Sequence, residues 1–105
     1  MAIIKDNKEH KHQHIYGGVK PNGDCWFGEG FNSRKIKEGT YFVEFDNPFA
    51  GLPAPACTIS GHEWMTFNMS IATVEITSGS FICITSSPDQ SIDCAFTFIA
   101  FGDAA

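Results

Sequence analysis

The stretch EHKHQH, residues 9–14, places three of the four histidines of the chain at alternate positions. Imidazole nitrogens bind transition metals, so His10, His12 and His14 are residues whose type and spacing suggest chemistry. Alternate residues share a face in an extended strand, whereas on a helix His12 would point away from His10 and His14. The spacing therefore favours either a metal-binding row of imidazoles on a strand or a solvated arm.

A second candidate site surrounds Trp64, which follows His62 and Glu63 and precedes Asn68. Sugars stack their C–H faces on aromatic rings, and nearby polar groups bind their hydroxyls. We therefore predict a ligand-binding site for carbohydrate at Trp64, His62, Glu63 and Asn68. The alternative is a tryptophan half buried at the end of a strand. Trp26 is the other candidate for an exposed aromatic side chain.

Signatures of enzymes are missing from the chain. HEWMT, residues 62–66, begins like the zincin motif but has Thr66 where the second histidine should stand. The sequence contains no G-x-S-x-G elbow, P-loop or dinucleotide-binding fingerprint, and its acidic residues are too scattered to assign a glycosidase pair. We expect a protein that is not an enzyme and has no catalytic residues, with an activity lacking any known signature as the alternative.

The four cysteines are Cys25, Cys57, Cys83 and Cys94, and no two of them have C-x-x-C spacing. A zinc ribbon or a thioredoxin-like motif is therefore not expected. The default expectation is free, buried thiols that pack as small apolar groups. A disulfide between Cys83 and Cys94, which lie in consecutive expected strands, is the alternative that the sequence leaves open.

Composition and charge limit the partners and the location of the chain. With 105 residues, 43% of them hydrophobic, it is long enough for one globular domain. Residues 1–37 hold all seven Lys and Arg and four acidic residues, whereas residues 38–105 hold eight acidic residues and no basic one. This balance argues against nucleic acid. We expect no membrane span and no signal peptide, hence cytoplasmic synthesis followed by virion association or by release without a signal peptide.

Short apolar or alternating segments separated by turn signals follow residue 24. In YFVEF, residues 41–45, three apolar side chains share one face, and FICIT, residues 81–85, is rich in β-branched residues. In CAFTFIAF, residues 94–101, Phe96 and Phe98 share one face, while Ile99 makes the other face apolar too. We predict an all-β, antiparallel, jelly-roll-like sandwich of about six to eight strands over residues 24–105, preceded by an N-terminal arm over residues 1–23.

Residues 28–59 and 78–102 resemble a recurrent bacterial and phage β-domain. The matching positions are Gly28, Gly30, Phe31, Gly39, Tyr41, Val43, Phe45, Pro48, Phe49, Pro55, Ala56, Gly79, Phe81, Phe96, Phe98, Ile99, Ala100 and Gly102. The pattern is similar to the C-terminal head domains of phage tail fibres and bacterial collagen-like proteins, and to H-type lectin domains. These are mainly core and turn residues, so the resemblance concerns the fold more than the ligand.

The resemblance implies a homotrimer that binds a receptor or a carbohydrate, for example a glycan on a cell surface. A trimerisation module with no small ligand is the alternative. Phage fibre tips carry His-x-His rows that bind iron along a threefold axis. By resemblance, His10, His12 and His14 of three chains would offer rings of imidazoles to a transition metal, namely iron, nickel or zinc.

Overall fold

The computed structural model describes residues 2–5, 11–61 and 68–105, and these residues contain nine strands and no helix. The strands are β1 (Ala2–Lys5), β2 (Lys11–Val19), β3 (Cys25–Gly28), β4 (Phe31–Lys37), β5 (Thr40–Phe45), β6 (Ala54–Ile59), β7 (Ser70–Val74), β8 (Ser80–Ser86) and β9 (Phe96–Asp103). Nothing in this part of the chain is therefore a helix that could cross a membrane.

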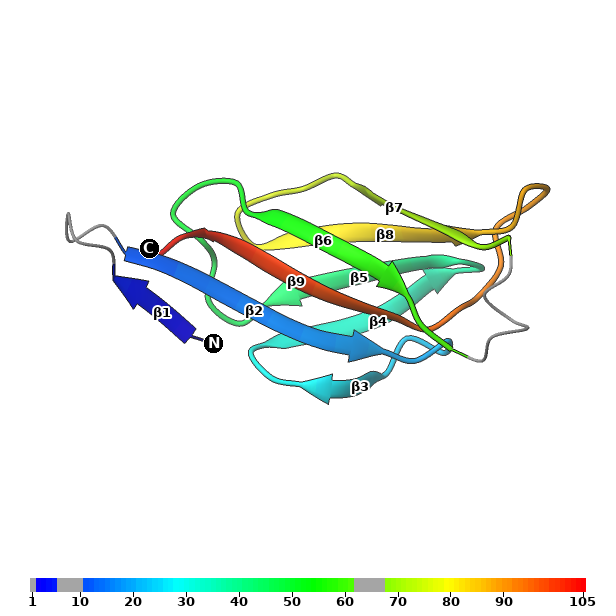
Figure 1. The fold of residues 1–105 in the computed structure, drawn as a ribbon, viewed down its shortest axis with the longest axis horizontal. Coiled ribbons are helices and arrows are strands. Elements are labelled where there is room, and N and C mark those ends of the chain that lie inside the picture. The colour runs from blue at the N-terminus through cyan, green and yellow to red at the C-terminus, as the bar shows by residue number, and fades with distance from the viewer. Residues whose placement is uncertain (1, 6–10, 62–67) are drawn as a thin grey trace.

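The strands form two antiparallel sheets (Figure 1). Sheet A has the order β1-β2-β9-β6, and β3 also pairs with β2. Sheet B has the order β4-β5-β8-β7. The expected all-β, sandwich-like fold is confirmed. The strand number exceeds the expected six to eight, because β1 and β2 lie in the segment expected to be an arm.

Period-two alternation directs one face of each main strand into the core. In β5, Tyr41, Val43 and Phe45 are buried while Glu44 is exposed, as the sequence predicts. The same alternation holds in β9, where Phe96 and Phe98 are buried.

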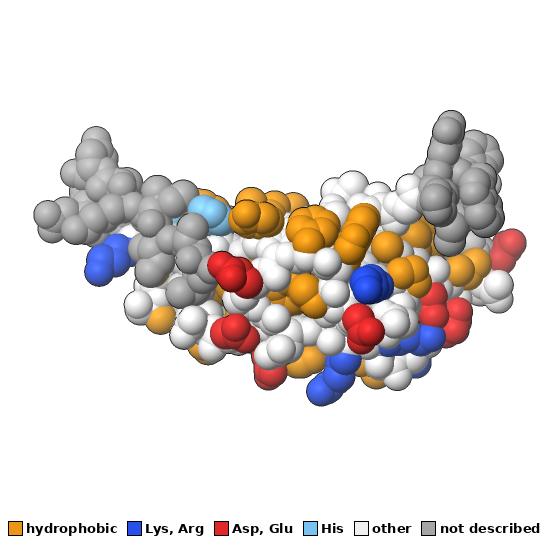
Figure 2. Space-filling view, turned by 90° about the horizontal axis from the view of Figure 1, so that it is seen from below, with side chains coloured by type: hydrophobic (Ala, Val, Ile, Leu, Met, Phe, Trp, Pro, Cys, Tyr) orange, Lys and Arg blue, Asp and Glu red, His pale blue; other side chains and the backbone are white. Residues whose placement is uncertain are grey.

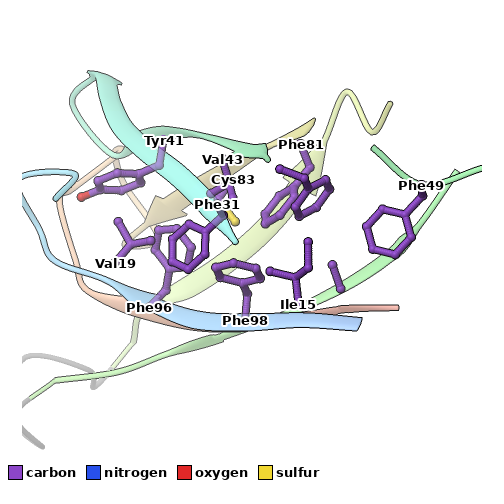
Figure 3. Packing of buried hydrophobic residues seen from close by; sticks show 12 residues of the cluster. Ile15, Val19, Phe31, Tyr41, Val43, Phe49, Phe81, Cys83, Phe96 and Phe98 are labelled. Carbon is purple, nitrogen blue, oxygen red and sulfur yellow. The ribbon is translucent and has the colours of Figure 1, made fainter. Parts of the chain in front are cut away.

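Aromatic rings from both sheets interlock between the layers (Figure 3). The ring of Phe98 in sheet A meets those of Phe31 and Phe81 in sheet B edge-on, with centroids 4.9 and 5.4 Å apart. Edge-to-face pairs at such distances add to the free energy gained by burying the rings. Phe98 is thus at the centre of the contact between the two sheets.

β2 is an integral strand of sheet A, although the sequence analysis assigned its residues to an arm. It pairs with β9 from His12 opposite Asp103 to Val19 opposite Phe96. Ile15 and Val19 are buried in the core, and Gln13 is buried with its side-chain Nε2 donating to the Asn47 carbonyl at 3.1 Å. The polar residues of β2 concealed this alternation, because the inward-facing Gln13 is satisfied by a loop that is distant in sequence.

Tyr41 joins two loops to the core. Its hydroxyl donates to the Pro21 carbonyl at 2.8 Å and accepts from the backbone N–H of Cys94 at 3.2 Å. Burial, reinforced by the negative charge of Asp93, raises the pKa of Tyr41 to about 12. The neutral, hydrogen-bonded hydroxyl is therefore the form that the fold favours.

Asp93 secures the turn between β4 and β5. Its carboxylate accepts from the backbone N–H of Gly39 at 2.7 Å and pairs with the ammonium group of Lys35. Gly39 has a φ of 67°, in the left-handed region that favours glycine. Burial opposes ionisation of Asp93, but the hydrogen bonds from Gly39 and Lys35 outweigh it, so the pKa of Asp93 is lowered.

Candidate functional site

The outer face of sheet A carries the described histidines. His12 and His14 lie on this face because they alternate along β2 with Gln13 and Ile15, which are buried. The strand conformation on which the predicted row of imidazoles depends is therefore present at these two positions. His10, the third member of the predicted metal site, lies outside the described residues.

Both imidazoles stack on aromatic rings of this face. The ring of His12 lies 5.6 Å from that of Phe101, and the ring of His14 lies 6.4 Å from both Phe101 and Tyr16. His12 Nδ1 is also 3.6 Å from the Asp103 carboxylate. The two imidazoles thus form part of a packed row that continues along β2 and β9.

The described residues of a single chain contain no group of three His, Cys, Asp or Glu side chains able to hold a metal ion. A transition metal at His12 and His14 would need nitrogens from further chains or from residues outside the described part. The described donor set therefore fits a metal only together with donors from other copies of the chain or from residues outside the described part.

An exposed apolar surface surrounds these imidazoles. We call it the aromatic face, and its members are Tyr16, Trp26, Phe27, Ile99 and Phe101. Of the seven large hydrophobic side chains exposed in the described part of the chain, these five lie on the outer side of sheet A. Figure 2 shows hydrophobic side chains along the upper margin of the molecule beside a histidine, with most charged groups below them.

Strand register places the centre of the aromatic face across three strands. Tyr16 of β2 lies opposite Ile99 of β9, which in turn lies opposite Ala56 of β6. One step along the same face, Phe101 lies opposite Ala54. The small side chains on β6 leave the larger groups of β9 accessible from that side.

Two aromatic rings from β3 extend the face past β2. The rings of Trp26 and Phe27 meet edge-on with centroids 5.3 Å apart. They cover the outer side of Gly18, where an added Cβ would lie 2.5 Å from the Phe27 ring and 3.0 Å from the Trp26 ring. Gly18 is thus required for this packing, and the exposure expected for Trp26 is confirmed.

The outer face of sheet B differs in character. There Phe42 of β5 lies beneath the guanidinium of Arg34, whose Cζ is 4.8 Å from the ring centroid. This cation–π contact covers an aromatic ring with a charged group. Among the described contacts, no charged group lies over Tyr16 or Ile99 of sheet A, and both side chains are exposed. The outer surfaces of the two sheets therefore differ chemically.

The predicted carbohydrate site falls mostly outside the described residues. His62, Glu63 and Trp64 lie there, whereas Asn68 is described and exposed, with a φ of 67°. The glycan site therefore stays a prediction. Sequence reasoning did not select Tyr16, Phe27 or Phe101 as site residues, and the apolar outer face of the last strand was a signal for Phe101 alone.

No known protein family, curated protein or solved structure matches the chain.

Proposed function

We propose that the chain is a non-enzymatic binding head module that assembles as a homotrimer through the aromatic face. The observation that carries this proposal is the concentration of exposed hydrophobic side chains on the outer side of sheet A. Contiguous apolar patches of this kind on a folded domain mark interaction sites.

A second copy of the same chain suits this surface better than a polar ligand does. Among the described residues, the centre of the face around Tyr16, Ile99 and Ala56 contains no charged side chain, and the charged Asp103 lies at the far end of β9. Protein interfaces have such an apolar core, depleted in charge, with polar groups at the rim. The trimeric state itself rests on the resemblance to tail-fibre heads and H-type lectins.

A trimer would also complete the metal site. Three copies of His12 and His14 around a threefold axis would supply six imidazole nitrogens, a number that suits octahedral transition metals such as iron or nickel. The position of both histidines on the outer side of sheet A supports this part of the proposal. The metal would link the three chains and stabilise their assembly.

The ligand in this proposal is a receptor or a carbohydrate, bound at Trp64, His62, Glu63 and Asn68. A trimer presents three such sites in fixed positions, and this multivalency strengthens binding to a surface that carries many copies of a glycan. The exposure of Asn68 is compatible with its assigned role. A trimerisation module with no small ligand is the second candidate, favoured by the same aromatic face.

The test of the assembly is a matched pair of substitutions. Ile99 in sheet A and Ile36 in sheet B have nearly equal exposure, 46% and 48%. Light scattering should give three times the 11.5 kDa chain mass for the unmodified protein and for Ile36→Asp, but the mass of a single chain for Ile99→Asp. A monomeric unmodified protein at micromolar concentration would overturn the proposal, and so would an Ile99→Asp variant that stays trimeric.

A glycan array separates the two candidate functions. Glycan binding that Trp64→Ala abolishes while the trimer persists would support the binding head module. A trimer that binds no glycan or cell surface would instead support the trimerisation module.

A further inference from the structure

Two cysteines from opposite sheets lie in contact inside the sandwich. Cys57 belongs to β6 of sheet A and Cys83 to β8 of sheet B, and their Sγ atoms are 3.2 Å apart. The Cys94 thiol lies elsewhere, where it donates to the Ser60 carbonyl at 3.8 Å. All four cysteines are free, so the Cys83–Cys94 disulfide considered from the sequence is not formed.

We propose that Cys57 and Cys83 are a redox-sensitive pair that forms a disulfide between the two sheets when the protein meets a low-molecular-weight disulfide. The thiols are already adjacent, so bond formation needs only a small approach of the two sulfur atoms. The bond would join β6 to β8, which share no backbone ladder. It would therefore cross-link the two sheets through the core.

The different burial of the two thiols sets the order of the reaction. Cys57 is half buried on β6, the edge strand of sheet A, whereas Cys83 is fully buried. The contact with Cys57, together with burial, raises the pKa of the Cys83 thiol. An external reagent therefore reaches Cys57 first, and Cys83 acts as the resolving thiol.

The chemistry is thiol–disulfide exchange in two steps. The Cys57 thiolate attacks one sulfur of the reagent disulfide, so that a mixed disulfide forms and one reagent thiolate leaves. The Cys83 thiolate then attacks Cys57 Sγ and displaces the second reagent thiolate. The two protons from the cysteines pass to the two leaving thiolates, and the two electrons reduce one reagent disulfide to two thiols.

The cross-link would make the stability of the sandwich depend on its redox environment. Cys57 and Cys83 are 26 positions apart in sequence, so their bond closes a loop of moderate length in the unfolded chain. Constraining such a loop raises the melting temperature, here by on the order of 10 °C. The inference is independent of the proposed assembly, because Cys57 and Cys83 face the core and not the aromatic face.

The test starts from the unmodified protein treated with oxidised glutathione. The protein is then alkylated under denaturing conditions and digested with a protease that cleaves on the N-terminal side of each aspartate. This cleavage places Cys57 and Cys83 together in the peptide of residues 46–88 and Cys94 in that of residues 93–102. The expected result is a 46–88 peptide that carries no alkyl group and is lighter than its reduced form by two hydrogen atoms, together with a 93–102 peptide in which Cys94 is alkylated. The folded protein should also gain melting temperature on oxidation, and dithiothreitol should reverse the gain.

Cys57→Ser provides the control, since it removes the more accessible thiol of the pair and leaves Cys83 in place. Its melting temperature should not respond to oxidised glutathione, whereas that of Cys25→Ser, in which an exposed thiol is removed, should respond like the unmodified protein. Two results would overturn the proposal. One is glutathione retained on Cys57 with Cys83 still alkylated, and the other is complete alkylation of both cysteines after oxidation.

Discussion

Replacing Tyr41 with phenylalanine tests whether one hydroxyl holds two loops on the sandwich. The ring of Tyr41 is fully buried and packs on that of Phe96 with centroids 5.3 Å apart. Phenylalanine keeps this packing and removes only the oxygen. The substitution therefore isolates the hydrogen bonds to the Pro21 carbonyl and from the Cys94 N–H.

The magnitude follows from the burial of the two partners. The Cys94 N–H is buried, so leaving it unpaired costs about 1–3 kcal/mol. Pro21 is an exposed residue, and its carbonyl regains water at a cost of about 0.5–1.5 kcal/mol. We expect Tyr41→Phe to lower the free energy of unfolding by about 2–3 kcal/mol.

The pH dependence gives the same test a second readout. Because the pKa of Tyr41 is raised to about 12 in the folded protein, the fold binds the phenolic proton more tightly than the unfolded chain does. This stabilisation is complete below about pH 10, the ordinary tyrosine pKa, and is lost as the pH rises through the folded value. The difference in stability between the unmodified protein and Tyr41→Phe should therefore shrink above pH 10.

Urea unfolding at pH 8, 10 and 11 measures these differences. Tyr16 is the only other tyrosine, so in a Tyr16→Phe variant the ultraviolet absorbance of tyrosinate reports Tyr41 alone. A loss below about 0.5 kcal/mol in Tyr41→Phe at pH 8 would refute the reasoning. A Tyr41 that titrates near pH 10 in the folded protein would refute it as well.

Two further predictions concern the core and the metal. Phe98→Ala should lower the free energy of unfolding by about 3–5 kcal/mol, since it removes the ring that contacts both Phe31 and Phe81. A loss below about 1 kcal/mol in urea unfolding would contradict that packing. Elemental analysis of the untagged protein should find at least one transition metal per trimer, and this metal should be lost in His12→Ala. A lower metal content, or a melting temperature that a chelator does not change, would count against the shared site.

The sequence alone determined the class of fold and the orientation of several strands. In β5, Tyr41, Val43 and Phe45 share one face opposite Glu44, and in β9 Phe96 and Phe98 share one face. Alternation along one strand is a local property that needs no partner to be recognised. The apolar outer side of the last strand was visible for the same reason, because Ile99 lies between the inward-facing Phe98 and Ala100.

The tertiary structure decided which strands are neighbours and which side chains meet. β2 was not recognised because Gln13, a polar residue, faces the core, and only its hydrogen bond to Asn47 in a distant loop makes that burial favourable. The pairing of β2 with β9 places His14 beside Phe101 and Tyr16 beside Ile99. These residues are far apart in sequence, so the aromatic face exists only once sheet A has formed.

The contact between cysteines was also decided by the tertiary structure and not by the local sequence. Cys83 and Cys94 drew attention because the sequence predicts consecutive strands for them, but Cys83 lies in β8 of sheet B, and Cys94 lies in the loop before β9 of sheet A. The packing of sheet A on sheet B instead places Cys57 against Cys83. Strand order and sheet packing depend on contacts between residues distant along the chain, and local alternation carries no information about them.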